Sequence, residues 1–158
     1  MKTIYAPEDF SQSVRTVFLA GSIETGGAEN WQDQIIAMLA NSDVTVLNPR
    51  RPQWDNSWEQ SLDNPAFVEQ VNWELDALQS ADCIVLYFDP ATKSPISLME
   101  LGLFADSKKL VVCCPEGFWR KGNVDIVCRR HAVPTVETIE ELADFAQSFV
   151  ARFVNPLI

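Results

Sequence analysis

Histidine is almost absent from this sequence: His131 is the only one among 158 residues. Ser-His-Asp catalysis needs a histidine as its general base, and catalytic zinc sites commonly take two or three histidine ligands. Both kinds of site are therefore nearly excluded. Any hydrolytic or group-transfer chemistry in this chain has to depend on carboxylates.

Basic residues and long apolar segments are also scarce. The chain has 12 lysines and arginines against 22 aspartates and glutamates, which gives a net charge of −10. This charge argues against nucleic acid polymers and anionic membranes as partners, although a few local donors could still hold a small nucleotide. No signal peptide, membrane-length apolar span or low-complexity tract is recognisable in the sequence. We expect a soluble, cytoplasmic protein.

The four cysteines do not have the spacing of metal ligands. None forms a C-x-x-C motif, and Cys83, Cys113 and Cys114 lie within apolar, strand-like runs. We expect them to be small core residues of a protein in a reducing compartment. Neither a metal nor another cofactor is expected.

Strand-like and helix-like patterns alternate along the chain. Short apolar runs predict strands at 16–20, 44–47, 82–88, 109–114 and 133–136. An edge strand at 2–5 is left open. Longer periodic segments predict helices at 29–40, 65–80, 94–105, 124–131 and 138–153. The alternation predicts one α/β domain over residues 1–158, a flavodoxin- or Rossmann-like three-layer sandwich with a parallel sheet of about five strands.

The segment from Ala81 to Ala105 carries the strongest signals. Its apolar strand is followed by a polar loop, and Ser94-Pro95 has the residue types of a helix N-cap and first helical position. The helix that follows is apolar nearly all round, which predicts that it is buried. Glu100 interrupts it, with no basic residue before Lys108 to neutralise the charge. Glu100 could pair with a distant arginine or cap a loop, or it could be a catalytic carboxylate at the carboxyl edge of the sheet.

A second acid has a similar position on the preceding helix. Glu74 stands seven residues after Phe67, so it lies over that apolar residue on the core-facing stripe. Glu74 and Glu100 are therefore predicted on inward faces of the two helices that flank one strand. Two carboxylates held close together can divide the work of glycosyl transfer, one attacking the anomeric carbon and the other moving the proton.

Three further segments are candidate binding or contact elements. The glycine-rich turn at 21–27 could present backbone N–H groups to a ligand, or it could be a plain connection. In the loop at 50–58, arginines could meet a phosphate and tryptophans could stack on a base, or the tryptophans could cover the core or a subunit interface. The apolar tail at 155–158 suggests docking against the body or against a partner subunit.

Four segments resemble the nucleoside 2-deoxyribosyltransferase superfamily, and most closely its nucleoside 2-deoxyribosyltransferase-like branch, which is related to the 2-deoxynucleoside 5′-monophosphate N-glycosidases. The segments are FLAGSI (18–23), LNPRR (47–51), WELDALQSADCIVLYF (73–88) and SPISLMELGLFA (94–105). The resemblance implies a nucleoside or nucleotide as substrate, no metal, and a homodimer or higher homo-oligomer in which a neighbouring subunit completes the site.

The resemblance also implies residue roles. The family nucleophile falls on Glu100, and the family's aspartate that orients and protonates the base falls on Glu74, where the extra methylene puts base specificity and activity in question. Ser94 falls on the position that contacts the 5′-hydroxyl or 5′-phosphate, and as a neutral donor it suits a phosphate. The residues expected to bind substrate are Gly21, Ser22, Ile23, Arg50, Trp54, Ser94, Ser97 and Asn123, the last from a neighbouring subunit.

These features favour cleavage or transfer at an N-glycosidic bond through a glutamate nucleophile. Two alternatives stay open. One is a non-catalytic sensor that binds a nucleotide or related metabolite on the same scaffold. The other is a flavodoxin-like FMN carrier, which the turn at 21–27 supports poorly because it supplies only part of a phosphate loop.

Overall fold

One parallel sheet carries the fold in the computed structural model, which describes residues 1–23 and 30–152. Within these residues its six strands have the order β1-β3-β2-β4-β5-β6. They are β1 (Lys2–Tyr5), β2 (Thr16–Gly21), β3 (Thr45–Asn48), β4 (Cys83–Tyr87), β5 (Leu110–Cys113) and β6 (Thr135–Val136). Without β1, this is the strand order of flavodoxin-like folds. The second half of the glycine-rich turn and the apolar tail lie outside the described residues.

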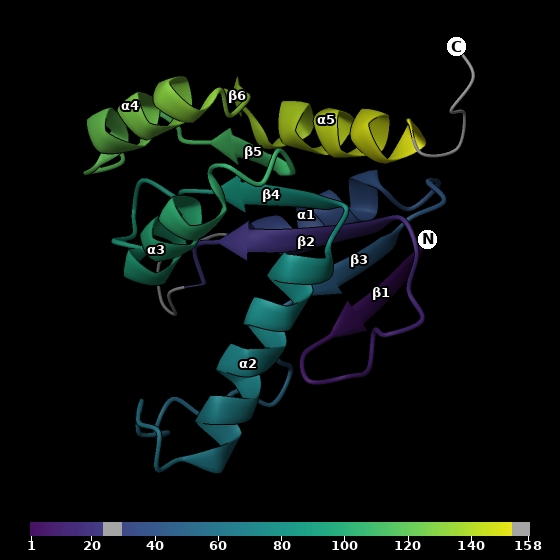
Figure 1. The fold of residues 1–158 in the computed structure, drawn as a ribbon, viewed down its shortest axis with the longest axis vertical. Helices are drawn as coiled ribbons and strands as arrows, with labels where there is room; N and C mark the ends of the chain where they lie inside the picture. Colours follow the sequence, from purple (N-terminus) through teal and green to yellow (C-terminus); the bar gives the residue numbers. More distant parts are fainter. Residues whose placement is uncertain (24–29, 153–158) are drawn as a thin grey trace.

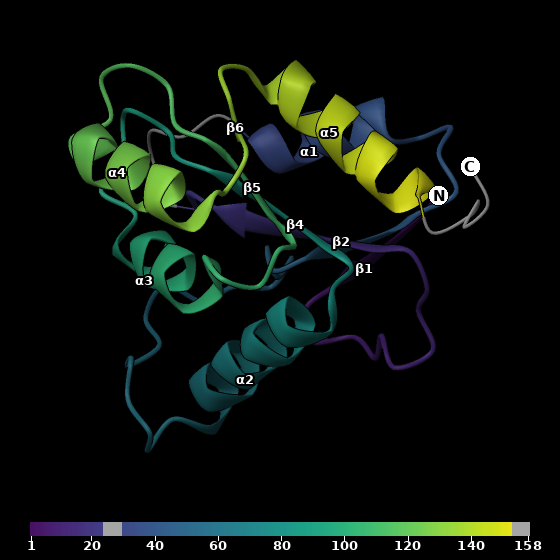
Figure 2. The ribbon, with the colours of Figure 1, turned by 45° about the horizontal axis from the view of Figure 1, so that its top comes forward.

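Five helices within the same residues cover the two faces of the sheet, as Figures 1 and 2 show. They are α1 (Trp31–Met38), α2 (Pro65–Ser80), α3 (Pro95–Phe104), α4 (Lys121–His131) and α5 (Ile139–Ala151). The helices α1 and α5 pack on one face, and α2, α3 and α4 on the other. The predicted three-layer α/β sandwich is confirmed, with the edge strand β1 as the addition that the sequence left open.

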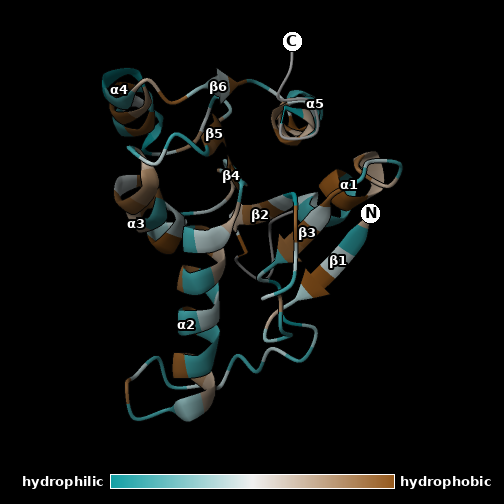
Figure 3. Cartoon of the chain, turned by 45° about the vertical axis from the view of Figure 1, so that its right-hand side comes forward, coloured by the Kyte–Doolittle hydropathy of each residue, from teal (hydrophilic) through white to brown (hydrophobic). Residues whose placement is uncertain are grey.

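The strands are apolar on both sides because helices cover both sides. The residues of β2, β3 and β5 are all buried, and Figure 3 colours β2 and β3 as hydrophobic while α2 mixes hydrophobic and hydrophilic residues. Within a strand, alternate residues enter opposite cores: Phe18 packs towards α2 and α3, and Leu19 packs towards α1 and α5. The registers of β2 and β4 align their carboxyl ends, with Gly21 opposite Tyr87.

The prediction that α3 is buried all round is wrong. Its outward face exposes Ile96, Met99 and Leu103 at 56%, 53% and 60%. Its inward face consists of Ser97, Glu100 and Leu101. Spacing alone would put Glu100 on the face of Ile96 and Leu103, four residues after one and three before the other. Glu100 instead faces inward while those two face outward, because a helix that lies on a sheet must turn one side outward whatever its composition.

Two other features bear on the environment of the protein. No helix in the described part of the chain combines the length and the apolar character that a membrane span requires. All four cysteines are buried free thiols, as expected for core residues.

Candidate active site

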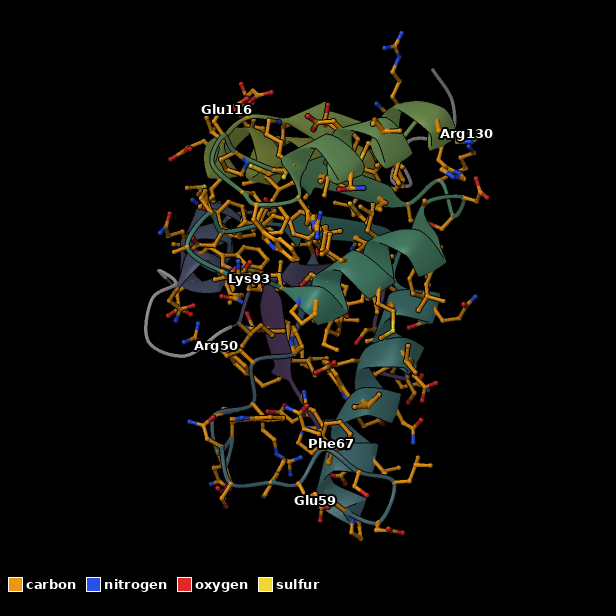
Figure 4. The ribbon with its side chains drawn as sticks, turned by 90° about the vertical axis from the view of Figure 1, so that its left-hand side faces the viewer. Arg50, Glu59, Phe67, Lys93, Glu116 and Arg130 are labelled. Atoms are coloured by element: carbon orange, nitrogen blue, oxygen red, sulfur yellow. The ribbon has the colours of Figure 1, made fainter. Side chains whose placement is uncertain are left out.

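The candidate site lies at the carboxyl edge of the sheet, where β2 and β4 end side by side. The chain leaves β2 towards β3 on one side, and β4 lies on the other, so this is the point at which the strand order reverses. Open α/β sheets bind their ligands at such points. In Figure 4, which faces this edge, Arg50 and Lys93 are labelled near the strand ends, whereas Glu59 and Phe67 lie at the far end of α2.

Gly21 ends β2 in a conformation that other residues rarely adopt. Its φ is +138°, and a Cβ atom placed there would lie 2.3 Å from the carbonyl oxygen of Tyr87. The close approach lets the next residue, Ser22, donate its backbone N–H to the same oxygen at 3.0 Å. The indole of Trp31 donates to the Ser22 carbonyl at 2.9 Å. The turn after β2 is thus fixed against both β4 and α1.

Three buried hydroxyl groups form a triangle beside this turn. Ser22 Oγ lies 2.9 Å from Thr92 Oγ1 and 2.6 Å from Ser94 Oγ, and the Thr92 and Ser94 hydroxyl oxygens are 2.7 Å apart. Ser22 Oγ also accepts the backbone N–H of Asp89 at 2.9 Å, and the Thr92 hydroxyl donates to the Asp89 carbonyl at 2.9 Å. The triangle joins the end of β2 to the loop between β4 and α3.

Ser94 begins α3 in an unusual way. Its φ of 47° and ψ of 53° are left-handed, and its side chain makes no capping hydrogen bond to the helix. Ser94 is the N-cap residue and Pro95 begins the helix, as the sequence predicts, but the Ser94 hydroxyl is held by Ser22 and Thr92 and does not cap the helix. A left-handed, non-glycine residue before a proline costs on the order of 1–3 kcal/mol, and such strain often marks a functional position.

The two predicted carboxylates come together beneath this edge. Glu100 projects from the inward face of α3 and is only 8% exposed. Glu74 is half-buried on α2. Burial and, to a smaller extent, the nearby charge of Glu74 together raise the pKa of Glu100 to about 8. Burial also raises the pKa of Glu74, while a hydrogen bond from Gln70 lowers it. The pair therefore holds one proton over much of the neutral range.

A glutamine on the same helix holds Glu74 in place. Gln70 is 2% exposed, and its Nε2 donates to Glu74 Oε1 at 2.7 Å and to the Pro49 carbonyl at 2.8 Å. Its Oε1 is buried and has no hydrogen-bond partner among the described residues. Gln70 thus connects the carboxylate pair to the chain that follows β3.

Arg50, the first of the two arginines in the LNPRR segment, lies beside this connection. Arg50 donates its backbone N–H to the buried Asn48 side chain at 2.9 Å, and its guanidinium donates to Gln32 Oε1 at 3.4 Å. Gln32 is fully buried, and its Nε2 has no hydrogen-bond partner among the described residues. A cation and two buried amides therefore lie around the end of β3.

The other predicted binding residues are placed less centrally. Ile23, within the turn that follows β2, is 37% exposed, and Ser97 is buried one helical turn before Glu100 on the inward face of α3. Trp54 packs against Trp58 in the loop after β3, with ring centroids 5.1 Å apart. Asn123 lines an apolar groove of about 330 Å³ between α3 and α4. Among the described residues, no hydrogen bond or ring contact joins Trp54 or Asn123 to the carboxylates, so their binding roles stay predictions.

The burial of Glu100 has a consequence for stability. Its folded-state pKa of about 8 exceeds the ordinary value of 4.5, so between these pH values the folded protein binds more protons than the unfolded chain. We expect the free energy of unfolding to fall as pH rises through this window, by on the order of a few kcal/mol. Urea denaturation at pH 5.5, 7 and 8.5 measures it.

Glu100→Gln is the matched variant for that measurement, because it keeps the shape and removes the titrating group. The variant should show a flatter pH dependence than the unaltered protein and gain relative stability at pH 8.5. Equal slopes for the two proteins would show that Glu100 does not titrate abnormally.

Sequence reasoning missed three polar residues of this edge. Gln70 stands one helical turn before Glu74, a spacing that could have identified it as a partner. Thr92 and Gln32 gave no comparable signal, since their contacts join segments 70 and 18 residues apart. Among the described residues, no cluster of three or more histidine, cysteine, aspartate or glutamate side chains could hold a metal ion.

Comparisons with solved structures identify the fold. The chain is similar to a conserved protein from Enterococcus faecalis V583, with a TM-score of 0.56 and 12% identity over 84% of this chain and 97% of that one. A second similar structure is FerB, a flavoenzyme NAD(P)H:(acceptor) oxidoreductase from Paracoccus denitrificans. Its TM-score of 0.43 and identity of 14%, over 90% of this chain and 96% of that one, are too low to support an argument.

Comparisons of sequence identify the family. No curated protein gives a significant match to the chain. Residues 14–118 match the profile of the family described as "Nucleoside 2-deoxyribosyltransferase like". The match spans more than half of the chain and includes β2, β4, α3 and both carboxylates of the site. On this evidence, the chain belongs to the nucleoside 2-deoxyribosyltransferase-like family.

Proposed function

We propose that this protein cleaves or transfers the N-glycosidic bond of a deoxynucleoside or its 5′-monophosphate, with Glu100 as the nucleophile and Glu74 as the proton donor. The observation that carries the proposal is the pair of carboxylates at the carboxyl edge of the sheet, coupled strongly enough for the charge of one to raise the pKa of the other. Family membership supports chemistry at N-glycosidic bonds.

The reaction begins with one proton on the carboxylate pair. When Glu74 carries it, the Glu100 carboxylate attacks C1′ of the sugar while the C1′–N bond breaks and its electron pair goes to the base. Glu74 then protonates the leaving nitrogen. Water or a second base resolves the glycosyl ester on Glu100, and two displacements at C1′ give net retention.

The three hydroxyl groups of the triangle would bind the 5′-hydroxyl or 5′-phosphate of the substrate. The Ser94 hydroxyl has one hydrogen, which can turn from the triangle towards a 5′-oxygen or phosphate oxygen. Ser22 can then donate to Ser94 Oγ at 2.6 Å, whereas the Thr92 hydrogen is already donated to the Asp89 carbonyl. Gly21 and Ile23 line the same turn, while Arg50, Trp54 and Ser97 complete the proposed binding set.

Base release is the direct test. The purified protein is incubated with deoxynucleosides and their 5′-monophosphates, with and without a free acceptor base, and the products are separated by chromatography. Release from monophosphates without an acceptor supports the hydrolase, and exchange only with an acceptor supports the transferase. Binding without turnover of any substrate would contradict the enzyme and favour the sensor.

We also propose that the protein is a homodimer or higher homo-oligomer through the outward face of α3, formed by Ile96, Met99 and Leu103. These three side chains are more than half exposed and carry no charge, on a chain whose net charge is −10. Two copies with such a charge approach most easily at an uncharged apolar face. Asn123, in the groove between α3 and α4, lies close enough in the fold to join this surface.

Met99→Glu should convert the oligomer to a monomer, because it replaces an apolar thioether side chain with a charge at the centre of the exposed face. Size-exclusion chromatography with light scattering measures the mass. Leu62→Glu is the matched control, since Leu62 is 93% exposed in the loop before α2 and should leave the mass unchanged. A monomeric unaltered protein would contradict the proposal.

We also propose a reducing, cytoplasmic location, because of the state of the cysteines. The four thiols are buried and unpaired, and burial raises the pKa of Cys83, Cys113 and Cys114 to about 12. Thiols in this state are poor nucleophiles, so they suit a packing role.

A further inference from the structure

Gln70 makes two hydrogen bonds that have no role in the proposed reaction as described above. Its amide nitrogen donates to the Pro49 carbonyl at 2.8 Å and to Glu74 Oε1 at 2.7 Å. The Pro49 carbonyl can only accept, so the nitrogen and oxygen of the amide cannot be exchanged. Both amide hydrogens are thus used, and burial to 2% exposure holds the side chain in this one arrangement.

We propose that Gln70 is a positioning residue that keeps the proton of the Glu74–Glu100 pair on Glu100 in the resting protein and directs any proton taken by Glu74 to its Oε2. The catalytic meaning of this inference rests on the proposed function. The proton distribution itself is a property of the protein without substrate.

The geometry favours an ionised Glu74. A donated hydrogen bond stabilises a carboxylate more than a neutral carboxyl group, and Glu74 Oε1 receives one from Gln70. Glu100 receives no hydrogen bond from the part of the chain that the structure describes, is 8% exposed, and faces the charge of Glu74 on the neighbouring helix. Gln70 is the polar group that acts on Glu74 from its own helix, and Glu74 is the charged group that acts on Glu100 from the neighbouring helix.

The contact also distinguishes the two oxygens of Glu74. A hydrogen bond from Gln70 leaves Oε1 as an acceptor, so a proton added to Glu74 goes to Oε2. In the reaction, the proton leaves Glu100 for Glu74 Oε2, which makes Glu100 a carboxylate. Glu74 Oε2 later gives the same proton to the leaving base. Gln70 therefore keeps the nucleophile uncharged until a substrate shifts the proton.

The test is a titration of the two carboxyl groups without substrate. Protein with 13C-labelled glutamate is followed by NMR from pH 4 to 10, and a Glu74→Gln sample assigns the signals. In the unaltered protein, Glu74 should ionise at lower pH than Glu100. The reverse order would overturn the proposal, and this measurement needs no variant of Gln70.

Gln70→Met then removes the donor while keeping the length and volume of the side chain. The pKa of Glu74 should rise by about one pH unit, and that of Glu100 should fall, because loss of a charge-assisted hydrogen bond is of that size. Gln79→Met is the matched control, as Gln79 is exposed on the same helix. Unchanged titration of Glu74 in folded Gln70→Met protein would overturn the proposal.

The outcome separates this inference from the proposed function. If the titration is as predicted but no base is released, the role of Gln70 in the proton distribution is supported and the proposed catalytic function is contradicted. Base release with an unchanged titration in Gln70→Met would support the proposed function and contradict the role of Gln70.

Discussion

Replacing Glu100 with glutamine should lower the rate of base release by on the order of 10⁴-fold or more. Glutamine keeps the size of the side chain and its place on the inward face of α3, but its amide cannot attack C1′. The covalent route is then closed, and only binding and proton donation by Glu74 remain. Single-turnover assays on deoxynucleosides and their 5′-monophosphates measure the loss.

Intact mass spectrometry gives the same prediction a second readout. Acid-quenched unaltered protein should gain the mass of one deoxyribosyl or deoxyribosyl-phosphate unit during turnover, and Glu100→Gln should gain none. Glu116→Gln is the control, because Glu116 is exposed in the loop after β5 and is labelled away from the site in Figure 4. A Glu100→Gln rate within tenfold of the unaltered protein would exclude Glu100 as the nucleophile.

Gly21→Ala should destabilise the fold by about 3 kcal/mol or more, or prevent folding. The added Cβ would lie 2.3 Å from the Tyr87 carbonyl oxygen and 2.9 Å from the Tyr87 nitrogen. Both contacts are with backbone of the neighbouring central strand, which cannot move without breaking the β2–β4 register. The φ of +138° adds strain for any residue with a Cβ.

Urea denaturation compares Gly21→Ala with the unaltered protein, and Gly102→Ala is the matched control. A Cβ at Gly102, on α3, would meet no heavy atom within 4 Å. That substitution should be neutral or stabilise the helix by up to about 1 kcal/mol. A Gly21→Ala protein of unaltered stability would mean that β2 and β4 do not approach as closely as described.

The sequence by itself determined the architecture. Apolar runs of strand length alternating with amphipathic segments can form little other than a parallel sheet with helices on both faces, because each run must be covered on two sides. The same periodicity placed Glu74 and Glu100 on helices that flank β4. A local cap belongs to the same class of features, as at Thr138, which begins the predicted helix at 138–153 and whose hydroxyl accepts from the N–H of Glu141 at 3.2 Å.

The tertiary structure decided what depends on contacts between distant segments. The hydroxyl of Ser94 bonds to Ser22, 72 residues away, rather than to its own helix, and no local rule could anticipate that choice. Likewise, α3 exposes Met99 because its place on the sheet, not its hydropathy, sets which side faces outward. Gln70 likewise hydrogen-bonds both Glu74 and the Pro49 carbonyl, because the fold brings the chain after β3 next to α2. Periodicity predicts which segments form strands and helices, whereas the outward face of an apolar helix and the partner of each polar side chain depend on which segments the fold brings together.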